Sequence, residues 1–118
     1  MNPMITVGAV SLRPRGGRLS FEIALQSIWS APQQLAVDLA VESPDPEETA
    51  VRRKVFELGT LHLDSDQAET LCGSVAIAPL ASRPIVPGRH HLDLLVNGVA
   101  FPLGGFSVVP RRAARRRR

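Results

Sequence analysis

The chain has 118 residues, which suits one domain of common size, and at this length a hydrophobic core needs no disulfide or structural metal. Its one cysteine, Cys72, excludes an intramolecular disulfide, and no apolar run approaches the roughly 20 residues of a membrane helix. The first residues also lack the basic start of a signal peptide. These properties predict a cytoplasmic protein without a membrane partner.

The charge is distributed unevenly along the chain. The formal net charge is +3, but residues 111–118, RRAARRRR, hold six arginines and no acid, which leaves a net charge of −3 on residues 1–110. A run of like charges whose only apolar residues are two alanines has no apolar anchor, so we expect it to be disordered in isolation. We therefore expect a β-sandwich domain over residues 1–110 and a disordered Arg-rich tail over residues 111–118.

Period-two alternation dominates the first half of the chain. A candidate strand covers residues 4–12, and two stronger ones follow, in which apolar residues alternate with polar ones as in half-buried strands. The segment SPDPEET, residues 43–49, has two prolines and three acids and predicts a loop. The predicted core residues of the two stronger strands are Leu19, Phe21, Ile23, Leu25, Leu35, Val37, Leu39 and Val41.

The second half continues in the same way. Candidate strands cover residues 51–63, with a bend at Gly59, and residues 71–78, with a polar turn between them. The stretch VPGRHHLDLLVNG, residues 86–98, predicts a strand with Leu92, Leu94 and Val96 facing the core, followed by a tight Asn-Gly hairpin. Residues 99–109 form an irregular last strand, where Pro102 and the Gly104 pair indicate an edge or a bulge.

About seven short strands with regular turn signals predict an all-β fold, an immunoglobulin/fibronectin-III-like β-sandwich. A small closed barrel is the alternative. No segment shows a helical apolar period.

The histidines raise the question of a reactive site. His90 and His91 are neighbours on a strand, so they point to opposite faces and cannot share one metal ion. His91 and Asp93 share a face and could meet His62 across a sheet, which would make a metal-dependent enzyme the alternative. We expect a solvated polar face instead, with His90 as a structural hydrogen-bonding group.

Nothing else in the sequence indicates catalysis. Cys72, in the context TLCGS, has no flanking histidine, so we expect a buried or half-buried structural thiol. The glycine pairs match no phosphate-binding loop. We therefore expect no catalytic residue, no metal and no cofactor.

Basic side chains make nucleic acid a candidate partner. The loop from Arg13 to Arg18 would form a basic patch if it lay beside Arg52 to Lys54, and the tail could bind phosphates without sequence preference or have no specific partner. Phe21 and Trp29 share the parity of core residues, which leaves no platform for base stacking. The candidate nucleic-acid-binding residues are Arg13, Arg15, Arg18, Arg52, Arg53, Lys54, Arg111, Arg112, Arg115, Arg116, Arg117 and Arg118.

Four fragments, taken in order, carry a family resemblance. They are SLRPRGGRLSFEIALQS (11–27), QQLAVDLAVE (33–42), RRKVFELGTLHL (52–63) and RPIVPGRHHLDLLVNG (83–98). Together they resemble the β-rich C-terminal region that follows the helical repeats of some bacterial DNA alkylation repair proteins, relatives of the HEAT-like DNA glycosylases. Ile85-Val86 departs from that pattern, which has an aromatic pair before the Pro-Gly turn.

The resemblance implies a non-catalytic accessory or interaction module, because the helical repeats that hold the family's glycosylase-type residues have no counterpart in these 118 residues. Such a module would be associated with DNA repair and contact nucleic acid or a helical-repeat partner. The alternative is a protein-binding or self-associating module that uses an exposed edge strand or a sheet face.

Overall fold

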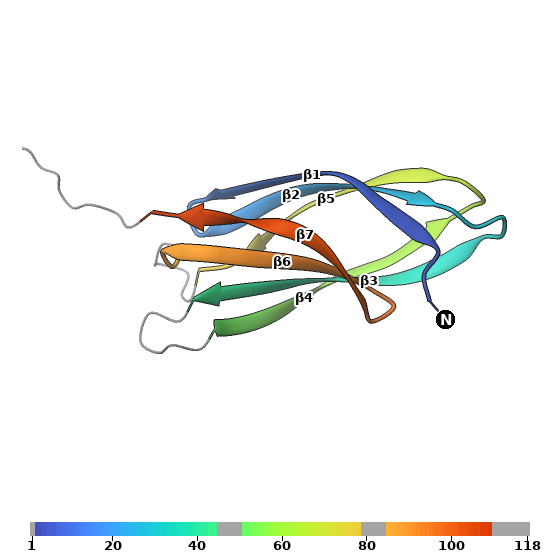
Figure 1. Ribbon diagram of the computed structural model, residues 1–118. Helices are drawn as coiled ribbons and strands as arrows, with labels where there is room; N and C mark the ends of the chain where they lie inside the picture. The colour runs from blue at the N-terminus through green and yellow to red at the C-terminus, as the bar shows by residue number, and fades with distance from the viewer. Residues whose placement is uncertain (1, 45–50, 79–84, 110–118) are drawn as a thin grey trace, which may run out of the picture.

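The computed structural model describes residues 2–44, 51–78 and 85–109. Seven antiparallel strands form two sheets, a three-stranded sheet in the order β1-β2-β5 and a four-stranded sheet in the order β4-β3-β6-β7 (Figure 1). The strands are β1 (Ile5–Arg15), β2 (Arg18–Ser27), β3 (Gln33–Pro44), β4 (Val51–Leu63), β5 (Ala68–Ala76), β6 (Gly88–Val96) and β7 (Val99–Val108). Within these ranges there is no helix that could cross a membrane.

The predicted β-sandwich of seven strands is confirmed, and the two sheets are separate instead of closing into a barrel. Several predicted boundaries differ. β1 extends to Arg15 instead of ending at residue 12, so Arg13 and Arg15, which we expected in a loop, lie on a strand, and β5 ends at Ala76 instead of residue 78. Ser43 and Pro44, which we expected in a loop, are the last residues of β3, and β5 begins at Ala68 instead of residue 71. Residues 45–49 of that loop and the tail 111–118 lie outside the described residues.

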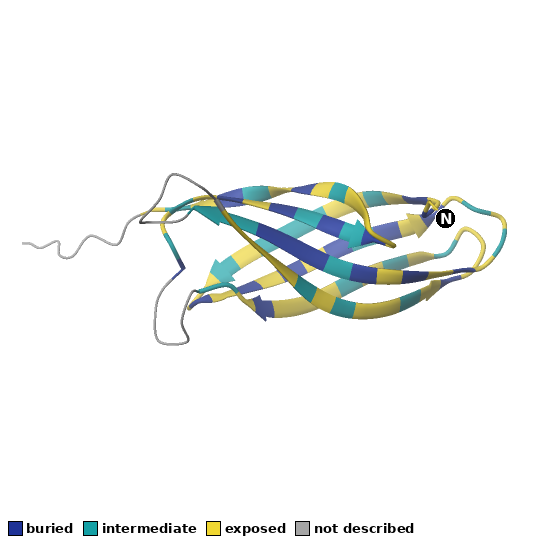
Figure 2. Ribbon diagram, turned by 90° about the horizontal axis from the view of Figure 1, so that it is seen from below, coloured by how far each residue is buried: buried dark blue, intermediate teal, exposed yellow. Residues whose placement is uncertain are grey.

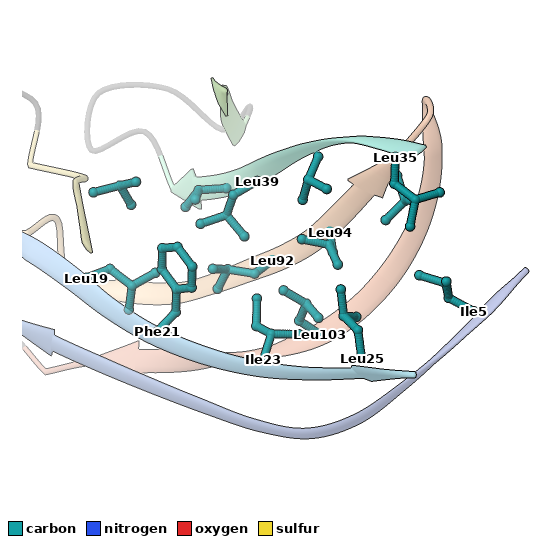
Figure 3. Packing of buried hydrophobic residues seen from close by; sticks show 14 of the residues in the cluster. Ile5, Leu19, Phe21, Ile23, Leu25, Leu35, Leu39, Leu92, Leu94 and Leu103 are labelled. Carbon is teal, nitrogen blue, oxygen red and sulfur yellow. The ribbon is translucent and has the colours of Figure 1, made fainter. Parts of the chain in front are cut away.

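The core lies between the sheets and comes mainly from β2, β3 and β6. Buried and exposed residues alternate along these strands (Figure 2), and every core residue predicted on them is buried. Figure 3 shows leucines of β3 and β6 facing Phe21 and Ile23 of β2. These core residues could be predicted from the sequence because successive side chains of a strand point to opposite faces.

Trp29 is not a core residue, contrary to the prediction. β2 ends at Ser27, so the parity of the strand does not extend to Trp29, which lies half-buried in the following turn. The Trp29 N–H donates to the Ser27 hydroxyl at 3.3 Å, and its carbonyl accepts from the Asp66 N–H at 3.4 Å.

The hairpin between β6 and β7 forms as predicted. Asn97 and Gly98 both have positive φ, 50° and 82°, as a two-residue type I′ turn requires. The Asn97 backbone N–H donates to the Ala36 carbonyl at 2.8 Å, and the Asn97 Oδ1 accepts from the Ala36 N–H, also at 2.8 Å. This one residue therefore closes the hairpin and ties it to β3.

Register shifts interrupt three of the edge strands. β1 shifts between Val7 and Val10, β4 has Leu58 as an extra residue before Gly59, and β7 has Leu103 as an extra residue after Pro102. The bend predicted at Gly59 and the bulge predicted near Gly104 are thus confirmed. By contrast, β5 pairs with β2 from Ala68 to Ala76 without any shift.

Candidate nucleic-acid interface

The two histidines of β6 lie on opposite faces, as predicted. His90 is completely buried, its ring stacks on Phe106 with the centroids 4.8 Å apart, and its Nδ1 lies 3.3 Å from the Gly88 carbonyl oxygen. Desolvation by burial lowers the pKa of His90, the Gly88 carbonyl opposes this shift, and the neighbouring His91 adds to it. His90 is therefore a structural residue that is neutral at neutral pH.

The metal site considered for His62, His91 and Asp93 does not form. His62 pairs with Gln34 near the start of β3, whereas His91 pairs with Glu42, eight residues further along the same strand. At about 3.3 Å per residue this separates the two histidines by roughly 26 Å. Within the described ranges, no three His, Cys, Asp or Glu side chains lie close enough to hold a metal ion.

Cys72 is exposed, which corrects the expectation of a buried or half-buried thiol. It pairs with Glu22 on the outer face of the three-stranded sheet, whereas Leu71 and Val75 of the same strand face the core. The alternation of Leu71 and Val75 was a signal in the sequence that Cys72 points outward.

Three of the candidate arginines share one surface. Arg13 pairs with Ser20 and Arg15 pairs with Arg18, so all three arginines project from the outer face of the three-stranded sheet near the β1–β2 turn. Arg18 is held in place, because its Nε donates to the Ser74 hydroxyl at 2.9 Å and its guanidinium donates to the Ser74 carbonyl at 3.1 Å. We call this surface, Arg13, Arg15 and Arg18, the basic face.

A shallow depression lies on the same surface. Its volume is about 360 Å³. It is lined by Ser11, Arg13, Arg15, Ser20, Phe21, Glu22, Cys72 and Gly73. Guanidinium and hydroxyl groups therefore surround it, and Glu22 is the carboxylate among them. This donor set suits phosphate oxygens.

The second basic group, Arg52 to Lys54, lies on the other sheet. Arg52 and Lys54 pair with Ser43 and Val41 and line a cavity of about 90 Å³ between β4 and residues 77–78, and the Lys54 ammonium lies 5.1 Å from the centre of the Phe56 ring. Arg53 pairs with Glu42 on the opposite side of β4. The two basic groups therefore do not join into one patch, and the six tail arginines lie outside the described residues.

The comparisons with known proteins agree with this architecture. A model of the family described as the C-terminal Ig-like domain of the uncharacterised protein YhaZ matches residues 6–110. No curated protein matches the chain.

Among solved structures, a similar one is the alkylpurine DNA glycosylase AlkC of Pseudomonas fluorescens bound to DNA containing an abasic site analog, with a TM-score of 0.78 and 25% identity. The match covers 92% of this chain and 31% of the glycosylase, so this chain corresponds to less than a third of that protein. A β-glucosidase of Listeria innocua in complex with gluconolactone has a TM-score of 0.67 at 11% identity, covering 90% of this chain and 16% of that one. The second match shows the shared fold alone.

Proposed function

This chain belongs to the family of the YhaZ C-terminal Ig-like domain, and we propose that it is a non-catalytic module of DNA alkylation repair that contacts the phosphate backbone of DNA through its basic face. The observation that carries the proposal is the likeness to a DNA-bound alkylpurine glycosylase, at 25% identity over 92% of this chain.

The chemistry of the basic face supports contact with phosphates. Arginine presents a planar fork of donors that matches two phosphate oxygens, and the three arginines are accompanied by serine hydroxyls. Phe21 is buried beneath the face, and no other aromatic side chain lines the depression. Base stacking is therefore not part of the proposal, and contacts of this kind hold a module on DNA without reading its sequence.

We assign no catalysis to the module. The exposed His62–Asp64 pair, with Nε2 and Oδ1 3.0 Å apart, lies at the other end of the four-stranded sheet from His91 and Asp93. Acid–base chemistry needs such groups to converge on one reacting atom.

Fluorescence anisotropy with a labelled duplex tests the proposal. The full chain is compared with a variant in which the six tail arginines are replaced by serine, and with the same variant carrying Arg13→Ala and Arg15→Ala. We expect the tail-neutral protein to retain salt-sensitive binding, and the removal of Arg13 and Arg15 to weaken that binding. If the tail replacement alone abolishes binding, the attraction belongs to the tail and the proposal is wrong.

A further inference from the structure

The four edge strands of the sandwich are not equally protected against pairing with another chain. Edge strands expose unpaired backbone groups, and proteins usually block them with bulges, prolines or charges. Along the described residues, β1 has a register shift and Pro14, β7 has Pro102 and the Leu103 bulge, and β4 has the Leu58 bulge. β4 also carries the basic run 52–54.

β5 has neither a bulge nor a proline, and its one charged residue, Glu69, lies near its start. Its register with β2 is continuous, it contains no proline, and residues 70–78, TLCGSVAIA, carry no charge. Six of its nine residues are exposed. A regular and exposed edge strand with a single charge near one end is the kind that accepts a further strand.

We propose that two copies of this chain pair through β5, antiparallel across a twofold axis, to form a continuous six-stranded sheet. Residues opposite each other in an antiparallel pair share a face, so a twofold axis perpendicular to the sheet passes through a residue position. Cys72 is the middle residue of Ala68–Ala76, so the register that overlaps all nine residues places the axis there. The two exposed Cys72 side chains then lie opposite each other on the outer face.

The second copy is a suitable occupant because this register is complementary to itself. The half-buried Leu71 falls opposite the partner's Gly73, which has no side chain, and Thr70 falls opposite Ser74. Glu69, the charged residue of β5, falls opposite Val75, so no like charges face each other. The pairing does not rest on the proposed contact with DNA.

Analytical ultracentrifugation of the full chain over a concentration series tests the pairing, with Cys72→Lys as the breaking variant. Cys72 is exposed on the monomer, so the lysine is tolerated there, but it places two like charges opposite each other in the dimer. We expect the dissociation constant of the dimer to rise about fivefold or more. The matched control, Thr6→Lys, adds the same charge at an exposed outer position of β1 and should leave the dimer unchanged.

A short bis-maleimide crosslinker tests the register separately. It should join two wild-type chains through Cys72, whereas Cys72→Ser combined with Ser20→Cys, which moves the thiol to the central strand β2, should give no crosslinked dimer. A protein that stays monomeric at every concentration would overturn the proposal. So would a dimer that Cys72→Lys leaves intact.

Discussion

The two outer faces of the sandwich carry opposite charge. On the three-stranded sheet, the basic face has three arginines against one carboxylate, that of Glu22. On the four-stranded sheet, the outward positions hold Asp38, Glu42, Glu57 and Asp93 against Arg53 and Arg89. We call this second surface the acidic face.

This difference teaches that the net charge of −3 over residues 1–110 conceals two surfaces of opposite sign. A polyanion such as DNA is attracted to one surface and repelled by the other, although both rest on the same core. Substitutions that disturb the shared core should therefore affect both faces, whereas substitutions at exposed positions should have smaller effects.

Asn97→Pro should have the largest effect, because it disrupts the scaffold that holds both faces. Proline fixes φ near −65°, whereas Asn97 has φ 50°, and it removes the N–H that donates to Ala36. We expect the free energy of unfolding to fall by about 3 kcal/mol or more, measured by urea denaturation. Asn97→Gly, which keeps the N–H and tolerates the positive φ, should cost far less. Equal decreases in the two variants would contradict this account.

Gly73→Ala tests the support beneath the basic face. A Cβ at residue 73 would lie 2.7 Å from the Phe21 Cζ, and Phe21 is only 4% exposed, so its ring has little room to move. Overpacking of this kind costs about 1–3 kcal/mol. Thermal or urea unfolding measures the destabilisation, and Cys72→Ala, on the exposed side of the same strand, should be nearly neutral. A neutral Gly73→Ala would show that Phe21 does not fill this space.

His90→Leu tests the core behind the acidic face, because it should change how the stability of the protein depends on pH. Because burial lowers the pKa of His90 in the folded protein, the unfolded chain binds a proton first as the pH falls below the ordinary histidine value of 6.5. The contribution of His90 to stability is therefore complete above that pH and declines below it, by at most about 1.4 kcal/mol per pH unit. Urea unfolding at a series of pH values should show this decline in the wild type and a shallower one in His90→Leu. Identical profiles would contradict a depressed pKa.

His91→Ala should have the smallest effect. His91 is exposed on the acidic face, and substitutions at such positions change stability by about 0.5 kcal/mol or less. The same unfolding assay, repeated with added Zn²⁺, should find no difference between His91→Ala and the wild type. A zinc-dependent stabilisation that requires His91 would show that His91 binds a metal ion.

Much of the fold could be predicted from the sequence because parity along a strand is local information. Leu92, Leu94 and Val96 identified the inner face of β6, and Asn97-Gly98 identified the hairpin. Trp29 was misplaced because that parity ends where the strand ends, at Ser27.

The candidate site was less predictable because it depends on which strands are neighbours. Cys72 lies on an exposed edge because β5 pairs with β2, and the separation of Arg13 from Arg52 follows from the assignment of β1 and β4 to different sheets. No local pattern encodes such long-range pairing. The opposite charges of the two faces can therefore be assigned only when the pairing and register of the strands are known.

The salt dependence of duplex binding tests the central claim, that one face of this module contacts DNA, most directly. The starting protein is the variant whose six tail arginines are replaced by serine. The logarithm of its association constant for the duplex is plotted against the logarithm of the salt concentration. The slope is then compared between two double variants, Arg13→Ala with Arg15→Ala on the basic face and Arg53→Ala with Arg89→Ala on the acidic face. The first pair should reduce the magnitude of the slope by about 0.9 for each phosphate that is no longer neutralised, and the second pair should leave the slope unchanged. Equal reductions by both pairs, or none by the first, would contradict the account.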